Sequence, residues 1–68
     1  MNVTLNGEPT VLPGEATVAD ALAAAGVEPD GRGVAVAIEG EVVPRADWRE
    51  RRLADGQSVE VVHAVQGG

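Results

Sequence analysis

One short segment with helical periodicity stands among several segments that alternate like strands, and this order limits the folds open to the chain. In the helical segment, apolar residues recur at three- and four-residue spacing, which is typical of a helix with one buried stripe. These residues are Val18, Ala21, Leu22 and Ala25. Thr17 and Asp20 have the spacing of a capping box, which predicts a helix of about two turns beginning at Val18. Gly26 is suited to end it in the left-handed conformation.

A hairpin is predicted before the helix. Residues 1–5 alternate apolar and polar side chains, as a half-buried strand does. Asn6-Gly7 follows, and this dipeptide favours a type I′ turn, in which both central residues have positive φ. We therefore expect residues 8–12 to return as the second strand. Pro9 suits only the start of a strand or an edge of the sheet.

Two further strands are predicted after the helix. Residues 28–33 combine proline, glycine and charged residues, which indicates a surface loop. Strands are expected at residues 34–39 and 41–43, and Gly40 permits a tight turn between them. One face of the first strand carries larger aliphatic residues and the other carries alanines, so we expect the alanine face to be either partly open or covered by something close. The two alanines are Ala35 and Ala37.

The last part of the chain predicts a helical turn and a final strand. Pro44 ends the preceding strand, and residues 45–52 are expected to form a single helical turn. Trp48, the only aromatic residue of the chain, is its expected apolar anchor. Asp55-Gly56 is a turn signal, and residues 58–65 alternate as a strand.

This order of elements predicts an α+β fold. A mixed sheet of four to five strands with one main helix on one face is the simplest layered arrangement that buries the helix stripe. That arrangement is the β-grasp, or ubiquitin-like, architecture. We expect the domain to span residues 1–65, followed by a flexible diglycine tail at residues 66–68.

Composition restricts the classes of function. The chain has 68 residues, eleven of them acidic and five of them arginines, and its net charge of −6 disfavours binding to nucleic acid or anionic membranes. Partners are expected to carry basic surfaces. There is no cysteine and only one histidine, so we expect no disulfide, no thiolate nucleophile and no metal site. Without a long apolar run or a signal-peptide pattern, we expect a soluble cytoplasmic protein.

The candidate functional group is the carboxylate of Gly68. Gln66, Gly67 and Gly68 follow the last predicted strand, and glycine allows another molecule to approach the backbone closely, as in a narrow enzyme cleft. An α-carboxylate is ionised at neutral pH and needs activation before a nucleophile attacks it. Small chain ends without function are also common, so the rest of the sequence must decide.

Docking residues are expected near the tail. Val62 and Ala64 alternate out of phase with the core positions of the last strand, which places them on the face away from the helix. With Val65, they are the candidate partner-docking residues, and Gln66 and Val65 are expected to set the reach of the tail. An ordinary structural role for these strand residues is an equal alternative.

Charged and titratable residues elsewhere predict little chemistry. His63 is in phase with the core positions of its strand, so we expect it at the edge of the core in a structural role, or exposed. Four arginines fall within residues 45–52, and we expect a solvated turn with Asp47 and Glu50 as local counter-charges. Contact with acidic groups of a partner is the alternative. These arginines are Arg45, Arg49, Arg51 and Arg52.

The second half of the chain, residues 37–68, resembles the ThiS family, the sulfur carriers of thiazole biosynthesis. The motifs shared in order and spacing are Val43-Pro44-Arg45, Trp48, Leu53, Asp55-Gly56, the alternating strand and Gly67-Gly68. The first half matches more loosely, through Asn6-Gly7 and residues 17–22. Gln57 departs from the family, in which aspartate is common at that position, but it falls in a turn.

This resemblance implies a β-grasp fold and a carrier that is not itself an enzyme. It further implies that a ThiF-type adenylyltransferase uses ATP to adenylate Gly68, which is then converted to a thiocarboxylate. The sulfur would come from an enzyme such as a cysteine desulfurase and would pass to thiazole synthase (ThiG). No cofactor bound to the carrier itself is implied.

Two alternatives remain open. The small subunit of molybdopterin synthase uses a similar diglycine thiocarboxylate, although this chain is short for that family and its Val-Pro-Arg and Trp pattern favours ThiS. A ubiquitin-like modifier would instead join Gly68 to lysines of target proteins. The chain contains no lysine, so it cannot build isopeptide-linked chains on itself, whereas a single attachment remains open.

Overall fold

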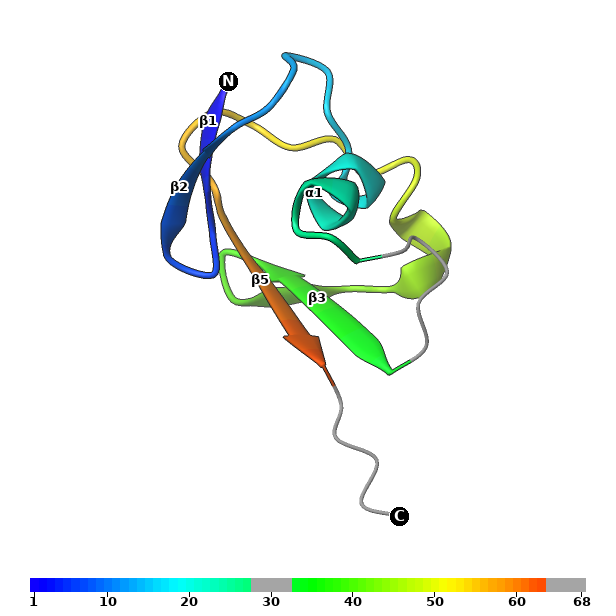
Figure 1. Ribbon diagram of the computed structural model, residues 1–68. Coiled ribbons are helices and arrows are strands. Elements are labelled where there is room, and N and C mark those ends of the chain that lie inside the picture. The colour runs from blue at the N-terminus through cyan, green and yellow to red at the C-terminus, as the bar shows by residue number, and fades with distance from the viewer. Residues whose placement is uncertain (28–32, 64–68) are drawn as a thin grey trace.

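The computed structural model describes residues 1–27 and 33–63 and shows one helix packed on a five-stranded sheet (Figure 1). The strands are ordered β2-β1-β5-β3-β4 across the sheet. Only β1 and β5 are parallel, and the other neighbours are antiparallel, so the predicted mixed sheet and α+β class are confirmed. The elements are β1 (Asn2–Leu5), β2 (Glu8–Val11), α1 (Val18–Ala24), β3 (Val34–Ile38), β4 (Glu41–Val43), the 3₁₀-helix η1 (Arg45–Asp47) and β5 (Ser58–His63).

Two turns with left-handed residues connect the antiparallel pairs at the edges of the sheet. Asn6 and Gly7 have φ values of 51° and 83°, which confirms the predicted type I′ turn between β1 and β2. Glu39 and Gly40 repeat this geometry, with φ values of 51° and 82°, between β3 and β4. Gly40 was predicted to turn the chain, but no sequence signal predicted a left-handed conformation for Glu39. Pro9 lies in β2, an edge strand, where a missing amide hydrogen is tolerated.

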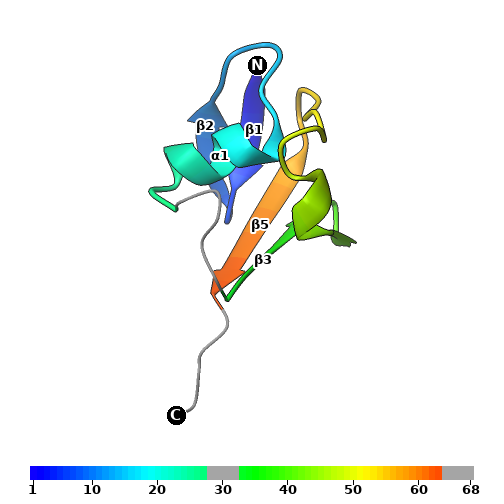
Figure 2. The ribbon, with the colours of Figure 1, turned by 90° about the vertical axis from the view of Figure 1, so that its right-hand side faces the viewer.

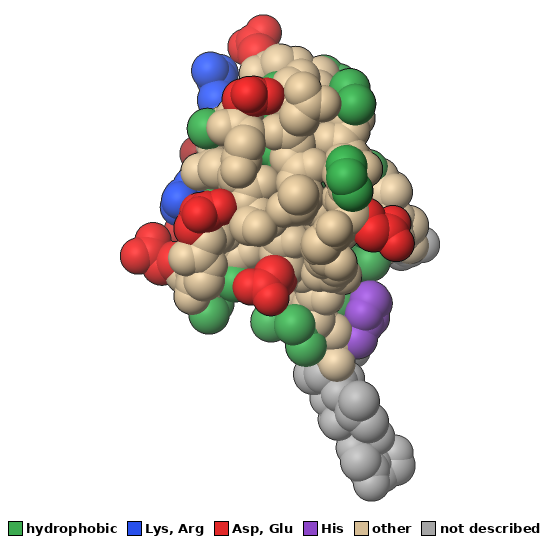
Figure 3. Space-filling model, turned by 90° about the vertical axis from the view of Figure 1, so that its left-hand side faces the viewer, with side chains coloured by type: hydrophobic (Ala, Val, Ile, Leu, Met, Phe, Trp, Pro, Cys, Tyr) green, Lys and Arg blue, Asp and Glu red, His purple; other side chains and the backbone are tan. Residues whose placement is uncertain are grey.

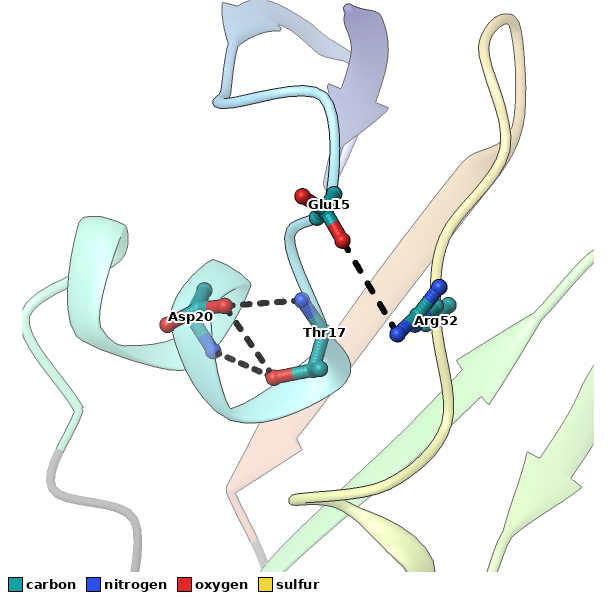
Figure 4. A network of polar contacts seen from close by, with 4 residues as sticks. All are labelled: Glu15, Thr17, Asp20 and Arg52. Carbon is teal, nitrogen blue, oxygen red and sulfur yellow. Dashed lines mark hydrogen bonds and ion pairs between the residues drawn. The ribbon is translucent and has the colours of Figure 1, made fainter.

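The start of α1 is fixed by the predicted capping box (Figure 4). The backbone amide of Thr17 donates to the Asp20 carboxylate at 2.8 Å, and the Asp20 amide donates to the Thr17 hydroxyl at 3.4 Å. The helix therefore begins at Val18, and Gly26 ends it with a φ of 79°. Ala25 was wrongly placed in the buried stripe: it is the C-cap, beyond the last helical residue, and its side chain is exposed.

The core fills the space between α1 and one face of the sheet, and Figure 2 shows α1 in front of that face. It is aliphatic apart from Trp48, which is 2% exposed and whose indole Nε1 donates to the Val43 carbonyl at 3.0 Å. The predicted helical turn over residues 45–52 is shorter than expected. Only Arg45–Asp47 forms a 3₁₀-helix, and Trp48 follows it as the C-cap. The buried core residues are Val3, Leu5, Leu12, Ala16, Val18, Ala21, Leu22, Val36, Ile38, Val43, Trp48, Leu53, Val59 and Val61.

The turn before β5 is held by two of its own side chains, one of which also bonds to the backbone of β1. Gly56 has a φ of 86°, as expected for a turn glycine. The Gln57 carboxamide accepts from the Ala54 amide at 2.7 Å, and the Asp55 carboxylate accepts from the Asn2 amide at 2.7 Å. The glutamine that departs from the family pattern is thus accommodated within the turn itself. Across residues 1–27 and 33–63, the helical segments lack the length and apolar character needed to cross a bilayer.

The capping box gives a direct test of helix stability. Thr17→Ala removes the hydroxyl that accepts from the Asp20 amide, so the free energy of unfolding should fall by about 1 kcal/mol. Thr17→Ser keeps a hydroxyl at the cap and is the matched control, with a loss well below that of alanine. Urea denaturation followed by circular dichroism measures both. Equal losses in the two variants would show that the hydroxyl is not what stabilises the helix start.

Candidate functional site

The end of β5 is the structural origin of the candidate site. β5 lies between β1 and β3, and its described part ends at His63, five residues before Gly68. The other predicted residues of this region are outside the described residues: Ala64, Val65, Gln66, Gly67 and Gly68.

The face of the sheet opposite α1 is hollowed beside the end of β5. Strand alternation places Ala35 and Ala37 of β3 on this face, and in the register they pair with Val62 and Glu60 of β5. Val42 of β4 pairs with Ala37. Because the alanines are small, a groove of about 160 Å³ opens between the larger side chains, so the alanine face is partly open, the first of the two predicted alternatives. We call it the open-face groove; it is lined by Ala35, Val36, Ala37, Val42, Glu60 and Val62.

The open-face groove has an apolar lining with one carboxylate in it. Val42 of β4 is 70% exposed and Val62 of β5 is 59% exposed, so two large aliphatic side chains meet solvent on either side of the β3 alanines. Glu60, on β5 with Val62 and paired with Ala37 of β3, adds a negative charge. Acidic side chains are also spread over the side of the molecule shown in Figure 3, with basic side chains only toward one margin. The open-face groove fits a partner that presents apolar side chains together with a cation.

A third exposed valine lies on the same face but far from the groove. Val11 of β2 is 78% exposed and pairs with Asn2 of β1, at the opposite edge of the sheet from β4. Its isolation makes it an ordinary surface residue rather than part of a patch. Of the predicted docking residues, the structure therefore places Val62 on the open face and adds Val42, which the sequence reasoning missed.

A second hollow, of about 360 Å³, lies between the β1–β2 hairpin and the end of α1. It brings together elements that are separated in sequence, so no local pattern announced it. Within the described residues no group of three or more histidine, aspartate and glutamate side chains is placed to hold a metal ion. The residues that line this second hollow are Leu5, Asn6, Glu8, Thr10, Ala24 and Ala25.

Asn6 contributes a contact that the sequence did not predict. Its side-chain Oδ1 accepts from the Val61 amide at 2.7 Å, and its Nδ2 donates to the Val61 carbonyl at 3.2 Å. The turn residue is thereby tied to the last strand, 55 positions away. The only sequence signal for this contact was the asparagine at the first position of the turn. The positive φ of the turn already accounts for an asparagine there, so the residue did not point to a further contact.

His63 and the arginines take surface positions. His63 was expected at the edge of the core or exposed, and it is exposed, because α1 does not cover the end of β5 where it pairs with Val34. Arg52 pairs with Glu15 at 3.8 Å, with both side chains largely in solvent, so the pair adds little stability (Figure 4). The Arg45 guanidinium lies 6.0 Å from the Trp48 ring centroid. The role of Asp47 and Glu50 as counter-charges stays a prediction.

Comparison with known proteins extends the resemblance over the whole chain. The model of the ThiS family matches residues 3–68. The sulfur carrier protein ThiS of Thermus thermophilus is 44% identical over 66 residues, which cover 97% of this chain and 98% of that protein.

Solved structures agree in fold. The crystal structure of the thiamine biosynthesis protein ThiS from Geobacter metallireducens superposes with a TM-score of 0.81 at 31% identity, with full coverage of both chains. A solution structure of a thiamine biosynthesis protein from the same organism gives a TM-score of 0.75 at 33% identity, covering 100% of this chain and 88% of that one. The β-grasp prediction is confirmed, and the chain belongs to the ThiS family of sulfur carriers.

Proposed function

We propose that this chain carries sulfur on the carboxyl group of Gly68 and donates it for thiazole formation in thiamine biosynthesis. The observation that supports this most strongly is the match to the ThiS family over residues 3–68, which includes Gly67 and Gly68. The relatives are named for sulfur carriage and for thiamine biosynthesis. The open-face groove beside β5 adds a surface on which partners can dock.

The proposed chemistry has two displacements and is performed by partner enzymes. First, a Gly68 carboxylate oxygen attacks the α-phosphorus of ATP in a ThiF-type adenylyltransferase, and pyrophosphate leaves. Second, hydrosulfide attacks the acyl carbon and AMP leaves; a thiol frees this hydrosulfide from the persulfide of an enzyme such as a cysteine desulfurase and is itself oxidised to a disulfide. Splitting the transfer in this way replaces one difficult step with two easier ones. The resulting thiocarboxylate gives its sulfur to thiazole synthase.

The body of the protein supplies presentation rather than catalysis. The chain itself binds no cofactor in this proposal, and ATP is bound by the adenylating partner. β5 roots the tail in the middle of the sheet, where neighbouring strands hold it on both sides. Val42 and Val62 offer apolar contact area, and Glu60 offers a charge that a basic side chain of the partner can meet.

Intact-mass measurement tests the proposal. The protein is incubated with ATP, the ThiF-type enzyme and a sulfur donor, and its mass is recorded. A gain equal to one sulfur atom minus one oxygen atom is expected for a carrier. Covalent adducts with other proteins would instead identify a modifier, and an unchanged mass with an adenylating enzyme that is active on a known ThiS protein would overturn the proposal.

Gly67→Val is expected to abolish adenylation while the protein stays folded. A branched side chain next to Gly68 collides with enzyme walls built close to the acyl adenylate and restricts the extended path of the tail. ATP–pyrophosphate exchange catalysed by the partner measures the effect. Gly14→Val is the matched control, because Gly14 lies in a loop with no heavy atom within 4 Å of an added Cβ. Exchange at the wild-type rate with Gly67→Val would contradict the expectation.

Val62→Asp tests the open-face groove as the docking surface. Adding a second carboxylate beside Glu60 in an apolar lining should raise the Kd for the adenylating enzyme by about tenfold or more. Val11→Asp is the same substitution at another exposed valine of the same face, outside the groove, and should leave the Kd unchanged. Both variants should keep the thermal midpoint close to that of the wild type, because both side chains are exposed. Equal affinities would show that the groove does not dock this partner.

A further inference from the structure

The side chain of Asn6 continues the pairing of β1 with β5 beyond the end of β1. The amides of Thr4 and Asn6 donate to the carbonyls of Gln57 and Val59, at 3.0 and 2.8 Å. These contacts advance by two residues on each strand, as parallel pairing requires. The next β5 residue in the series is Val61, but the chain has already turned at Asn6, whose φ is 51°.

At this point the carboxamide of Asn6 replaces a peptide group. Its Oδ1 accepts from the Val61 amide at 2.7 Å and its Nδ2 donates to the Val61 carbonyl at 3.2 Å. The Oδ1 acceptor of Asn6 faces the N–H of Val61, and its Nδ2 donor faces the C=O of Val61. These two partners therefore fix which end of the carboxamide carries the oxygen. Both bonds are partly buried, where loss of a partner costs more than at the surface.

Val61 has no equivalent partner on its other side. The backbone N–H and C=O of one strand residue point to the same edge. Those of Val61 point to β1, so its register neighbour in β3, Val36, forms a non-hydrogen-bonded pair with it. Glu60, the preceding residue, points its backbone groups to β3 instead. Beyond Val59, the β1 side of β5 is therefore held at Val61 by the side chain of Asn6.

We propose that Asn6 is a positioning residue: its clamp on Val61 fixes the end of β5 and so the direction in which the chain leaves toward Gly68. Only two residues separate Val61 from His63, the last residue of β5, and Gly68 lies five residues further. This inference rests on the proposed function, in which Gly68 must reach an enzyme's active site. Asparagine suits the position because it tolerates a left-handed φ and also carries the donor and acceptor.

Hydrogen exchange tests the clamp itself. Asn6→Gly keeps the turn geometry but removes both side-chain bonds, so exchange of the Val61 amide should accelerate about tenfold or more relative to the adjacent Glu60 amide. Ile38→Val is the control, since it removes one methylene from a core residue that is 2% exposed and that makes neither of the hydrogen bonds between Asn6 and Val61. It should speed up exchange of both amides alike. An unchanged ratio in Asn6→Gly would overturn the clamp.

Kinetics of adenylation test its functional role. For Asn6→Gly we expect kcat of ATP–pyrophosphate exchange to fall several-fold with KM unchanged, because Asn6 is outside the open-face groove. Ile38→Val should retain the wild-type kcat. Asn6→Asp keeps the acceptor but loses the donor, so it should also lower kcat. It replaces Asn6→Gly in this test if the glycine variant does not fold.

The outcomes separate this inference from the proposed function. A folded Asn6→Gly protein with accelerated Val61 exchange but wild-type kcat would overturn the positioning role and leave the carrier function intact. A fall in kcat of the same size in Ile38→Val would also overturn it, because the effect would then follow stability. If the wild-type protein is itself not adenylated by an enzyme that accepts a known ThiS protein, the proposed function fails instead.

Discussion

The central position of β5 is the constraint on which the rest of the structure depends. This strand pairs with β1 in parallel and with β3 in the antiparallel sense, so it joins the N-terminal hairpin to the second half of the chain. Alternate residues of β5 point to opposite faces of the sheet. Val59 and Val61 enter the core beneath α1, whereas Glu60 and Val62 line the open-face groove. One strand therefore supplies the core, the proposed docking surface and the root of the tail.

Because the domain is small, one strand has to contribute to the core, the surface and the tail together. A chain of 68 residues buries a modest core, and here the core is aliphatic except for Trp48. Little interior remains in which to build a private catalytic site, and no buried side-chain polar atom of the described residues lacks a hydrogen-bond partner. The structure instead offers a surface and a held strand end. Both fit the proposed function, in which the chemistry takes place in the active sites of partner enzymes.

Local signals predicted most of the elements because their causes are local. The Thr17 and Asp20 cap, the Asn6-Gly7 turn and the alternation in β5 each depend on residues a few positions apart. The errors arose where tertiary context decides. Ala25 is exposed because α1 ends one residue earlier, and Glu39 takes a left-handed φ because the β3–β4 hairpin requires it in a two-residue turn. The sequence pattern had no means of showing either constraint.

The candidate site divides in the same way. The position of Val62 on the open face follows from period-two alternation alone. The contribution of Val42 depends on the pairing of β3 with β4, and the contact between Asn6 and Val61 depends on the parallel pairing of β1 with β5. A pair of residues 55 positions apart leaves no periodic trace in one sequence. Only the three-dimensional arrangement shows that a turn residue also holds the last strand.

The pairing of β1 with β5 also delays completion of the sheet as the molecule folds. Thr4 lies beside Ser58, so strands from the two ends of the chain must meet before the sheet has a middle. Contacts of such long sequence separation form only after a large loop closes, and during synthesis they must wait until residues 58–63 have emerged from the ribosome. A half-made or misassembled copy has neither the central strand nor the groove beside it. Any enzyme that docks on this surface consequently distinguishes finished molecules from unfinished ones.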